Sequence, residues 1–522
     1  MQAGKKVVIL ERGVEYAPDE FDRNTWWKEE TRIKEEYADG TFLYANEFAG
    51  ASKYFDDLAQ IEGKGHPWTF QYNMWRGVGG SSQMWSGMAW RLCPDDFQTK
   101  SKFGYGTDWP ISYAEMAPYY DRAEELLEVA GPSPKETASY KYWPWSNNFQ
   151  YPPFKLSYLD KKFQSVIGDE GEIVAQPHAV RNKSPEDGGC VGAKTCVSYC
   201  PTKAIFKGNE RILPEILFDD NLIIMSNACA TRIIWKNDGD IIEGIEALDH
   251  ETGVSTTIEA ETYFLCANAL ENIRLIKSSE MLNGGAFGDS SRYVGKYFSS
   301  HAALTYTVDL EEKVFPVRGR PTHGSVIEWV AREQGEYRTG VTMEVWNSNF
   351  IRGYHPKRHF EVLAEEGHWG NYLFDTLERY EHQFCVSMIF ETEMVEEKEV
   401  SLSTRNFDKF GLPLARADVQ LTSLDLQSVR FIEGKIDQIR NRFGVRSIEM
   451  NGCGLNGNHP LGGLRMSDSA DTGVVDSFSR CHDFKNLYIL GGGAFCSTGS
   501  FNPTLTITAL ALRALDDPRL GW

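Results

Sequence analysis

Three cysteines lie close together in the middle of the chain, at Cys190, Cys196 and Cys200, and Pro201 follows the last of them. The spacing Cys-x5-Cys-x3-Cys-Pro places three sulfur ligands in one short segment. Such a group is a metal or iron–sulfur site, the remnant of a disulfide, or a chance cluster. Structural zinc takes four ligands, and a disulfide would leave one thiol over. The residues alone leave these alternatives open.

A histidine and an asparagine near the C-terminus could act on a substrate proton. His459 lies in the glycine-flanked stretch NGNHPLGGLRM, and Asn502 follows further along the chain. Neutral imidazole has a pKa near the operating pH of a general base, and a carboxamide can orient a substrate oxygen. A lone histidine in a loop is more often a surface residue, so the surrounding elements must support this role.

The element around Asn502 is predicted to be a strand followed by glycines and a helix. The stretch NLYILGGGAFCSTGSFNPTLTITALALRALDD contains an apolar strand at 487–490, three glycines and a periodic apolar helix that begins at Pro503. Proline is favoured at the first helical position, and Asn502 is a good N-cap. Because a helix N-terminus carries partial positive charge, it stabilises an anion in front of it. The arrangement predicts a cofactor-binding loop.

A second strand, at 7–10, ends in the carboxylate Glu11. In dinucleotide-binding units such a carboxylate bonds a ribose hydroxyl, and the glycine fingerprint precedes it by about 20 residues. Only ten residues precede Glu11. We therefore expect the fingerprint and the first strand to be missing, because the sequence is a truncated or mis-started part of a longer one.

The composition narrows the class of protein. A chain of 522 residues is expected to form at least two domains. The formal charge is −20, from 54 basic and 74 acidic residues. The sequence lacks the clusters of Lys and Arg that nucleic-acid binding requires. No apolar run approaches the roughly 18 residues of a membrane span. Ten cysteines in a chain of this length do not indicate a disulfide scaffold.

Several motifs in their order resemble the glucose-methanol-choline (GMC) flavoprotein oxidoreductases. The stretch HPLGG at His459, GVVD, NLYILGGG and GSFNPTLTITALALRA match the C-terminal signature of that family. WRGVGGSSQMWSGMAWR resembles its first glycine-rich signature, CANALENIRLIKSSE its second, and SLSTRNFDKFGLPLARADV a hairpin of its substrate domain. VGKYFSSH resembles an element that normally carries Asp where this chain has Ser300, and Asp is also common at the position of Gly491.

The resemblance implies FAD as cofactor, with His459 as catalytic base and Asn502 holding the substrate oxygen. It also implies which residues lie against FAD: Glu11, Gly77, Gly79, Gly80, Ser81, Cys229, Gly492, Pro503 and Thr504. The cysteine spacing is similar to that of the catalytic subunits of bacterial FAD-dependent sugar dehydrogenases, of the glucose, fructose or gluconate type. There the three thiolates hold a [3Fe-4S] cluster, which implies the same role for Cys190, Cys196 and Cys200.

The implied fold is α/β, with a Rossmann-like FAD-binding domain that lacks its first strand and glycine loop, and an α+β substrate domain in which helices cap a sheet. We expect the FAD-binding domain to comprise 1–109, 205–301 and 455–522. The substrate domain is expected at 110–188 and 302–454, with the iron–sulfur insertion at 189–204. The aromatic stretches of the substrate domain are expected to fill its core for the most part, and the Glu-rich 361–381 is expected to form a solvated helical cap.

The expected reaction is oxidation of a hydroxyl of a sugar, sugar acid or polyol, with electrons leaving through the cluster to a cytochrome. The alternatives are a GMC oxidase or glycoside 3-oxidoreductase without a working cluster, and an inactive fragment. The resembling dehydrogenases work in the periplasm, at the membrane face. They have a small export subunit and a cytochrome c subunit, and we expect the same location and partners here.

Overall fold

The computed structural model describes most of the chain. The described ranges are 4–13, 69–72, 77–133, 143–144, 149–193, 196, 200–236, 239–316, 318–332, 336–347, 363–408 and 410–522. Within these ranges no helix is both long and apolar enough to cross a membrane. Trp75 and Arg76, which open the first glycine-rich signature, lie outside the described residues.

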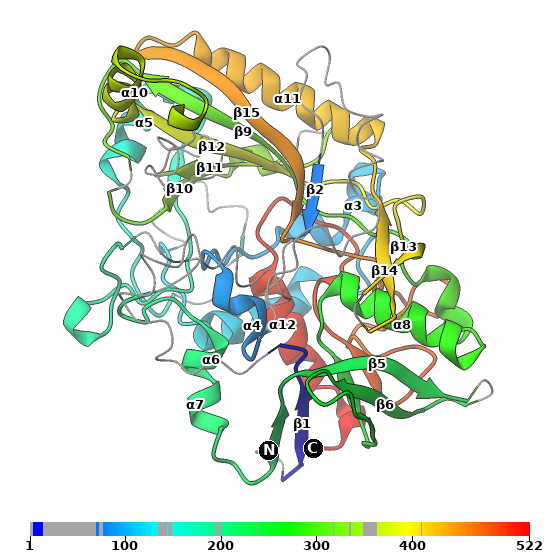
Figure 1. Cartoon of the computed structure of the whole chain (residues 1–522). Helices are drawn as coiled ribbons and strands as arrows, with labels where there is room; N and C mark the ends of the chain where they lie inside the picture. Colours follow the sequence, from blue (N-terminus) through cyan, green and yellow to red (C-terminus); the bar gives the residue numbers. More distant parts are fainter. Residues whose placement is uncertain are drawn as a thin grey trace.

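The largest element is a seven-stranded sheet, which forms the upper part of the molecule in Figure 1. Neighbouring strands are antiparallel, except that β2 and β15 run parallel. In sheet order the strands are β2 (Thr69–Tyr72), β15 (Val445–Gly457), β9 (Ala302–Leu310), β12 (Gln383–Phe390), β11 (Val341–Trp346), β10 (Thr322–Val326) and β3 (Ile173–Ala175).

The sheet and a long helix bury apolar side chains at their own periods. Along β9, Ala302, Leu304 and Tyr306 are buried in alternation with partly exposed residues. The helix α11 (Ser423–Arg440) begins at Thr422, whose hydroxyl accepts the backbone N–H of Asp425. Its buried positions recur at helical spacing, and the helix runs along β15 and β9 in Figure 1. The expected helix-capped sheet of the substrate domain is present.

Parallel strand pairs and crossover helices form the lower part of the molecule (Figure 1). They confirm the α/β class. The strands are the parallel pairs β1 (Val7–Leu10) with β4 (Leu222–Met225) and β16 (Leu487–Ile489) with β8 (Tyr263–Leu265), and an antiparallel sheet of β5 (Ala228–Trp235), β6 (Ile242–Asp249) and β7 (Ser255–Ile258). β1 runs parallel to β4, and its residues Val8 and Ile9 are 41% and 39% exposed.

The remaining helices join these sheets. They are α3 (Thr99–Phe103), α4 (Tyr113–Leu126), α5 (Tyr158–Ile167), α6 (Gly208–Arg211), α7 (Leu213–Ile216), α8 (Ala269–Asn283), α10 (Asn371–Tyr380) and α12 (Thr504–Leu515). α4 packs on α12, where the Tyr120 hydroxyl lies 2.9 Å from the Thr506 hydroxyl. The predicted cap at 361–381 is represented by α10, and residues 361–362 lie outside the described part.

Two segments connect the two predicted domains. β2 lies in the range assigned to the FAD-binding domain, yet it extends the large sheet by pairing with β15. The predicted hairpin is present as β13 (Glu399–Phe407) and β14 (Pro413–Asp418). It packs on α8, where the buried Arg274 guanidinium donates to the Asp408 carboxylate at 2.6 Å. The hairpin thus joins the substrate part of the chain to the cofactor part.

Candidate active site

Two histidines meet where two neighbouring strands of the large sheet end. His301 directly precedes β9, and His459 follows β15. The backbone N–H of Asn456 donates to the His301 carbonyl at 2.7 Å, which holds the two chain segments together. The two Nδ1 atoms lie 2.9 Å apart, and the rings are nearly perpendicular at 88°. The sequence motif contained His301, but its pairing with His459 was not predicted.

The hydrogen bonds of this pair determine where the protons lie. His301 Nε2 is 2.9 Å from the Thr498 carbonyl, which can only accept, so Nε2 carries the proton. His301 Nδ1 then accepts, and His459 Nδ1–H is its donor. Asn456 Nδ2 lies 3.2 Å from His459 Nδ1 and is the longer, competing contact. In this arrangement Nε2 of His459 keeps its lone pair, as a general base requires.

Burial keeps both imidazoles neutral. It lowers the pKa of His459 well below its ordinary value, and the neighbouring His301 contributes further. Burial also lowers the pKa of His301 to about 4, although its bonds to Thr498 and Gly499 act in the opposite direction. The pair is therefore uncharged at pH 7, and His459 is ready to accept a proton.

Asn502 bonds a buried carboxyl instead of capping the last helix. The prediction of Asn502 as N-cap is wrong by one residue: α12 begins at Thr504, and Pro503 takes the cap position with helical backbone angles. The Asn502 side chain hydrogen-bonds Glu344 on β11, which is 3% exposed. Burial raises the pKa of Glu344 to about 7, and hydrogen bonds from Asn502 and Trp346 lower it in part.

Sequence reasoning missed Glu344. The signal was a single carboxylate within the otherwise apolar stretch VTMEVW. One segment connects both predicted catalytic residues. The Thr498 carbonyl accepts a hydrogen bond from His301, which is the partner of His459, and Asn502 lies four residues after Thr498. The predicted pair is therefore anchored to a common stretch of backbone.

The two positions at which the family commonly has Asp, Ser300 and Gly491, have local explanations. Ser300, which stands where the family usually has Asp, donates its hydroxyl proton to the Asn456 carbonyl. An ionised Asp has no proton to donate, so serine suits this contact. Gly491 has φ +100°, a conformation that residues with a Cβ rarely adopt, so glycine rather than Asp fits there.

The predicted FAD contacts at the N-terminal side come together. Glu11 Oε1 accepts the backbone N–H of Gly77 at 3.2 Å and that of Gly13 at 2.7 Å. No described residue donates to Oε2 of this half-buried carboxylate, so it can receive a ribose hydroxyl. The Glu11 carbonyl accepts from Ala228, which places the buried Cys229 alongside. A Cβ on Gly80 would meet no atom within 4 Å, and Ser81 beside it is exposed.

The remaining predicted FAD contacts lie at the C-terminal side, next to the histidine pair. Gly492 follows β16, and its carbonyl accepts the backbone N–H of Gly462 in the loop after His459. Pro503 is buried, and Thr504 is the first residue of α12. Gly79 packs on α6, since a Cβ there would be 3.1 Å from Asn209. These predicted contacts thus lie in loops or near the ends of elements, with Cys229 at the start of β5 and Thr504 at the start of α12.

The three cysteines border one small apolar cluster, and each is a free thiol. Cys196 is buried, whereas Cys190 and Cys200 are half-buried. Cys190 Sγ accepts the N–H of Gly192 at 3.4 Å, and Cys200 Sγ accepts that of Ala204 at 3.1 Å. Among the described residues, no group of His, Cys, Asp or Glu is already arranged as a metal site. Residues 194–195 and 197–199 lie outside that part of the chain.

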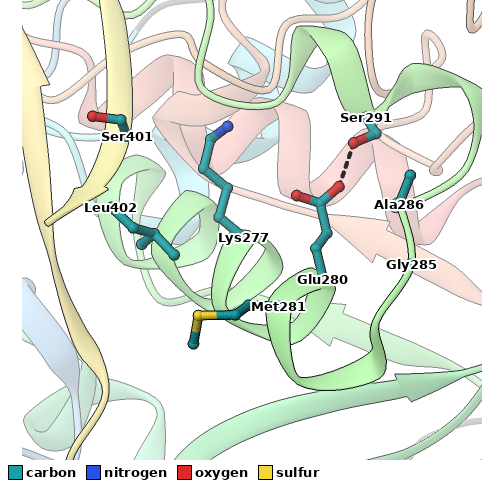
Figure 2. A pocket seen from close by; sticks show the side chains of 8 residues that line it. All are labelled: Lys277, Glu280, Met281, Gly285, Ala286, Ser291, Ser401 and Leu402. Atoms are coloured by element: carbon teal, nitrogen blue, oxygen red, sulfur yellow. Dashed lines mark hydrogen bonds between the residues drawn. The ribbon is translucent and has the colours of Figure 1, made fainter. Parts of the chain in front are cut away.

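A surface hollow of about 510 Å³ lies elsewhere, between the end of α8 and β13. Figure 2 shows Lys277, Glu280 and Met281 of α8 along it, with Ser401 and Leu402 of β13 opposite. Glu280 accepts the Ser291 hydroxyl. Neither the histidine pair nor Asn502 lines this hollow, so it is distinct from the candidate active site.

Comparisons with known proteins agree with this arrangement. Two family models, both described as GMC oxidoreductase, match residues 173–303 and 400–511. The fructose dehydrogenase large subunit of Gluconobacter japonicus is 25% identical over 98% of this chain and 93% of that protein. The 2-methyl-1,2-propanediol dehydrogenase of Mycolicibacterium austroafricanum is 26% identical over 84% of this chain and 80% of that protein.

Solved structures agree on the fold. The crystal structure of pyridoxine 4-oxidase from Mesorbium loti aligns with a TM-score of 0.61 and 13% identity, covering 98% of this chain and 94% of that one. This likeness concerns the fold, and the class of protein rests on the two family matches, at residues 173–303 and 400–511. The chain is matched by both GMC oxidoreductase family models and is an FAD-dependent enzyme that acts on CH–OH groups.

Proposed function

We propose that this enzyme is the catalytic subunit of a dehydrogenase that oxidises a hydroxyl of a sugar, sugar acid or polyol. Its electrons would leave through a [3Fe-4S] cluster on Cys190, Cys196 and Cys200 to a cytochrome. The observation that carries the proposal is the convergence of three free thiols on one apolar cluster, two of them with backbone N–H groups directed at sulfur.

The histidine pair and Asn502 supply the steps that the chain itself performs. His459 Nε2 would take the hydroxyl proton, and His301 would keep the imidazole in the required tautomer. The Asn502 amide would hold the substrate oxygen, next to the carboxyl of Glu344. When bound, FAD supplies the hydride acceptor. Glu11, whose Oε2 lacks a donor among the described residues, would bind its ribose.

The surroundings of the cysteines suit thiolates. Backbone N–H groups that donate to sulfur stabilise its anionic form. Arg320 and Lys207 are both buried nearby, and their charges lower the pKa of Cys196, although burial raises it by more. Three thiolates match the three irons of a [3Fe-4S] cluster, whereas structural zinc needs a fourth ligand. When bound, the cluster supplies a one-electron relay.

The resemblance also supports the partners and the location. The fructose dehydrogenase match is named a large subunit, which supports smaller partner subunits here. We propose a small export subunit and a cytochrome c subunit, and a periplasmic location in which the membrane is reached only through a partner. An enzyme that sends electrons from its cluster to a cytochrome would need a surface beside the cluster on which the cytochrome binds.

One experiment separates this proposal from the alternatives. The enzyme is purified anaerobically, and iron, acid-labile sulfide and FAD are measured with a dye-reduction screen over sugars, sugar acids and polyols. We expect three irons per FAD, and loss of iron but not of FAD in Cys196→Ser. Cys266→Ser, at an exposed thiol, is the control. Peroxide formation without iron would instead support an oxidase or a glycoside 3-oxidoreductase, and absence of FAD would support an inactive fragment.

A further inference from the structure

A buried arginine lies against the cysteine segment. Arg320 is 2% exposed, and its guanidinium stacks 4.1 Å above the ring of Phe154. Its Nη1 is 3.8 Å from Cys190 Sγ. Its Nε and Nη2 have no hydrogen-bond partner within the described part of the chain. An unpaired buried polar group costs about 1–3 kcal/mol, and more when charged, so this guanidinium indicates an anionic partner.

The backbone fixes Arg320 in this place. Gly192, two residues after Cys190, packs so closely that a Cβ on it would lie 3.2 Å from the Cα of Gly319. The Arg320 carbonyl accepts the side-chain amide of Asn347 at 3.1 Å. Arg320 also lies two residues before β10, so the large sheet holds it. The large sheet and Asn347 therefore hold Arg320 from one side, and Gly192 of the cysteine segment packs against it from the other.

Neutral thiols would not explain this burial of positive charge. Lys207 is also buried, at 4% exposure, and burial lowers its pKa, while Glu210 and, to a smaller extent, Cys200 and Cys196 act to raise it. Two cations thus lie beside three cysteines in an apolar region, where the interaction between charges is strong. A site of three protonated thiols requires no cations, whereas an anionic iron–sulfur group does.

We propose that Arg320 compensates the negative charge of the group held by Cys190, Cys196 and Cys200 and thereby raises its reduction potential. The inference rests on the proposed function, because it assigns the anion to the cluster. A nearby cation favours the reduced form, which carries one more negative charge. Arg320 therefore affects electron transfer through the cluster and not the transfer of the substrate hydroxyl proton to His459.

Two substitutions at the same site test the role of the charge. Arg320→Gln removes it, and Arg320→Lys keeps it but loses the planar stacking on Phe154. The cluster is titrated anaerobically and followed by electron paramagnetic resonance. At a fixed ambient potential we expect the ratio of reduced to oxidised cluster to fall about tenfold in Arg320→Gln, which is about 59 mV for one electron. Arg320→Lys should stay near wild type. Equal potentials in wild type and Arg320→Gln would overturn the inference.

A measurement on the wild-type enzyme covers the case in which Arg320→Gln does not fold. With ¹⁵N-arginine as the only label, pulsed electron paramagnetic resonance should detect a ¹⁵N nucleus weakly coupled to the cluster. Absence of that coupling would overturn the inference even where iron and sulfide are present, and the proposed function would stand. Absence of iron and sulfide from the wild-type enzyme would remove both.

Discussion

The buried carboxyl of Glu344 gives the sharpest prediction, because its titration must appear in the pH dependence of stability. Glu344→Gln removes this titration and keeps the shape of the side chain. Burial raises the pKa of Glu344 from 4.5 to about 7 in the folded protein. At 1.36 kcal/mol per pH unit, this difference corresponds to about 3 kcal/mol. Since the folded state holds the proton more tightly, the contribution is fully present below pH 4.5 and is lost as the pH rises through 7.

The assay compares urea unfolding of the two proteins between pH 4.5 and pH 8, followed by tryptophan fluorescence. Glu344→Gln should gain up to about 3 kcal/mol relative to wild type across this interval. Glu449→Gln, at an exposed glutamate of β15 in the same sheet, is the matched control and should show no such trend. If the difference between wild type and Glu344→Gln does not change with pH, the burial argument for this carboxyl is refuted.

Three further substitutions and one pH profile give additional predictions. His459→Gln should slow flavin reduction by about 10²- to 10⁴-fold with FAD retained. In wild type that rate should stay flat as the pH falls through 6.5, because the lowered pKa of His459 keeps it neutral there; stopped-flow absorbance measures both. Asn502→Ala should raise the pKa of Glu344 above about 7 by removing a hydrogen bond to its ionised form, seen as a shifted stability profile. Asp408→Ala should cost about 1–3 kcal/mol of unfolding free energy, because it removes the shorter of the two carboxylate contacts of the buried Arg274, at 2.6 Å against 3.2 Å for Glu271.

Local pattern was enough to predict the elements that hold the site. The strand at 7–10 is present at the same residues, and the strand predicted at 487–490 is β16 (Leu487–Ile489). Both are short apolar runs followed by glycine or charge, which is a signal contained within a few neighbours. The helix predicted from Pro503 begins one residue later, since proline favours the start of a helix without fixing its cap.

Local sequence patterns could not predict the contacts between residues that lie far apart in the sequence. His301 and His459 are 158 positions apart, and only the pairing of β9 with β15 brings them together. Glu344 looked like a surface residue by type, because no local rule predicts that a glutamate in a strand faces the interior. Arg320 was missed because its neighbour in space, Cys190, lies on a segment far away in the sequence.

The register of β15 against β9 determines where His459 lies relative to His301. Two bulges in β15, between Val445 and Ser447 and between Met450 and Gly452, shift its pairing before it reaches the partner of Ala302. Deleting one bulge residue would move His459 by one step along the ladder and turn alternate side chains to the opposite face. Insertion or deletion of a single residue within these two strands would therefore move His459 away from His301.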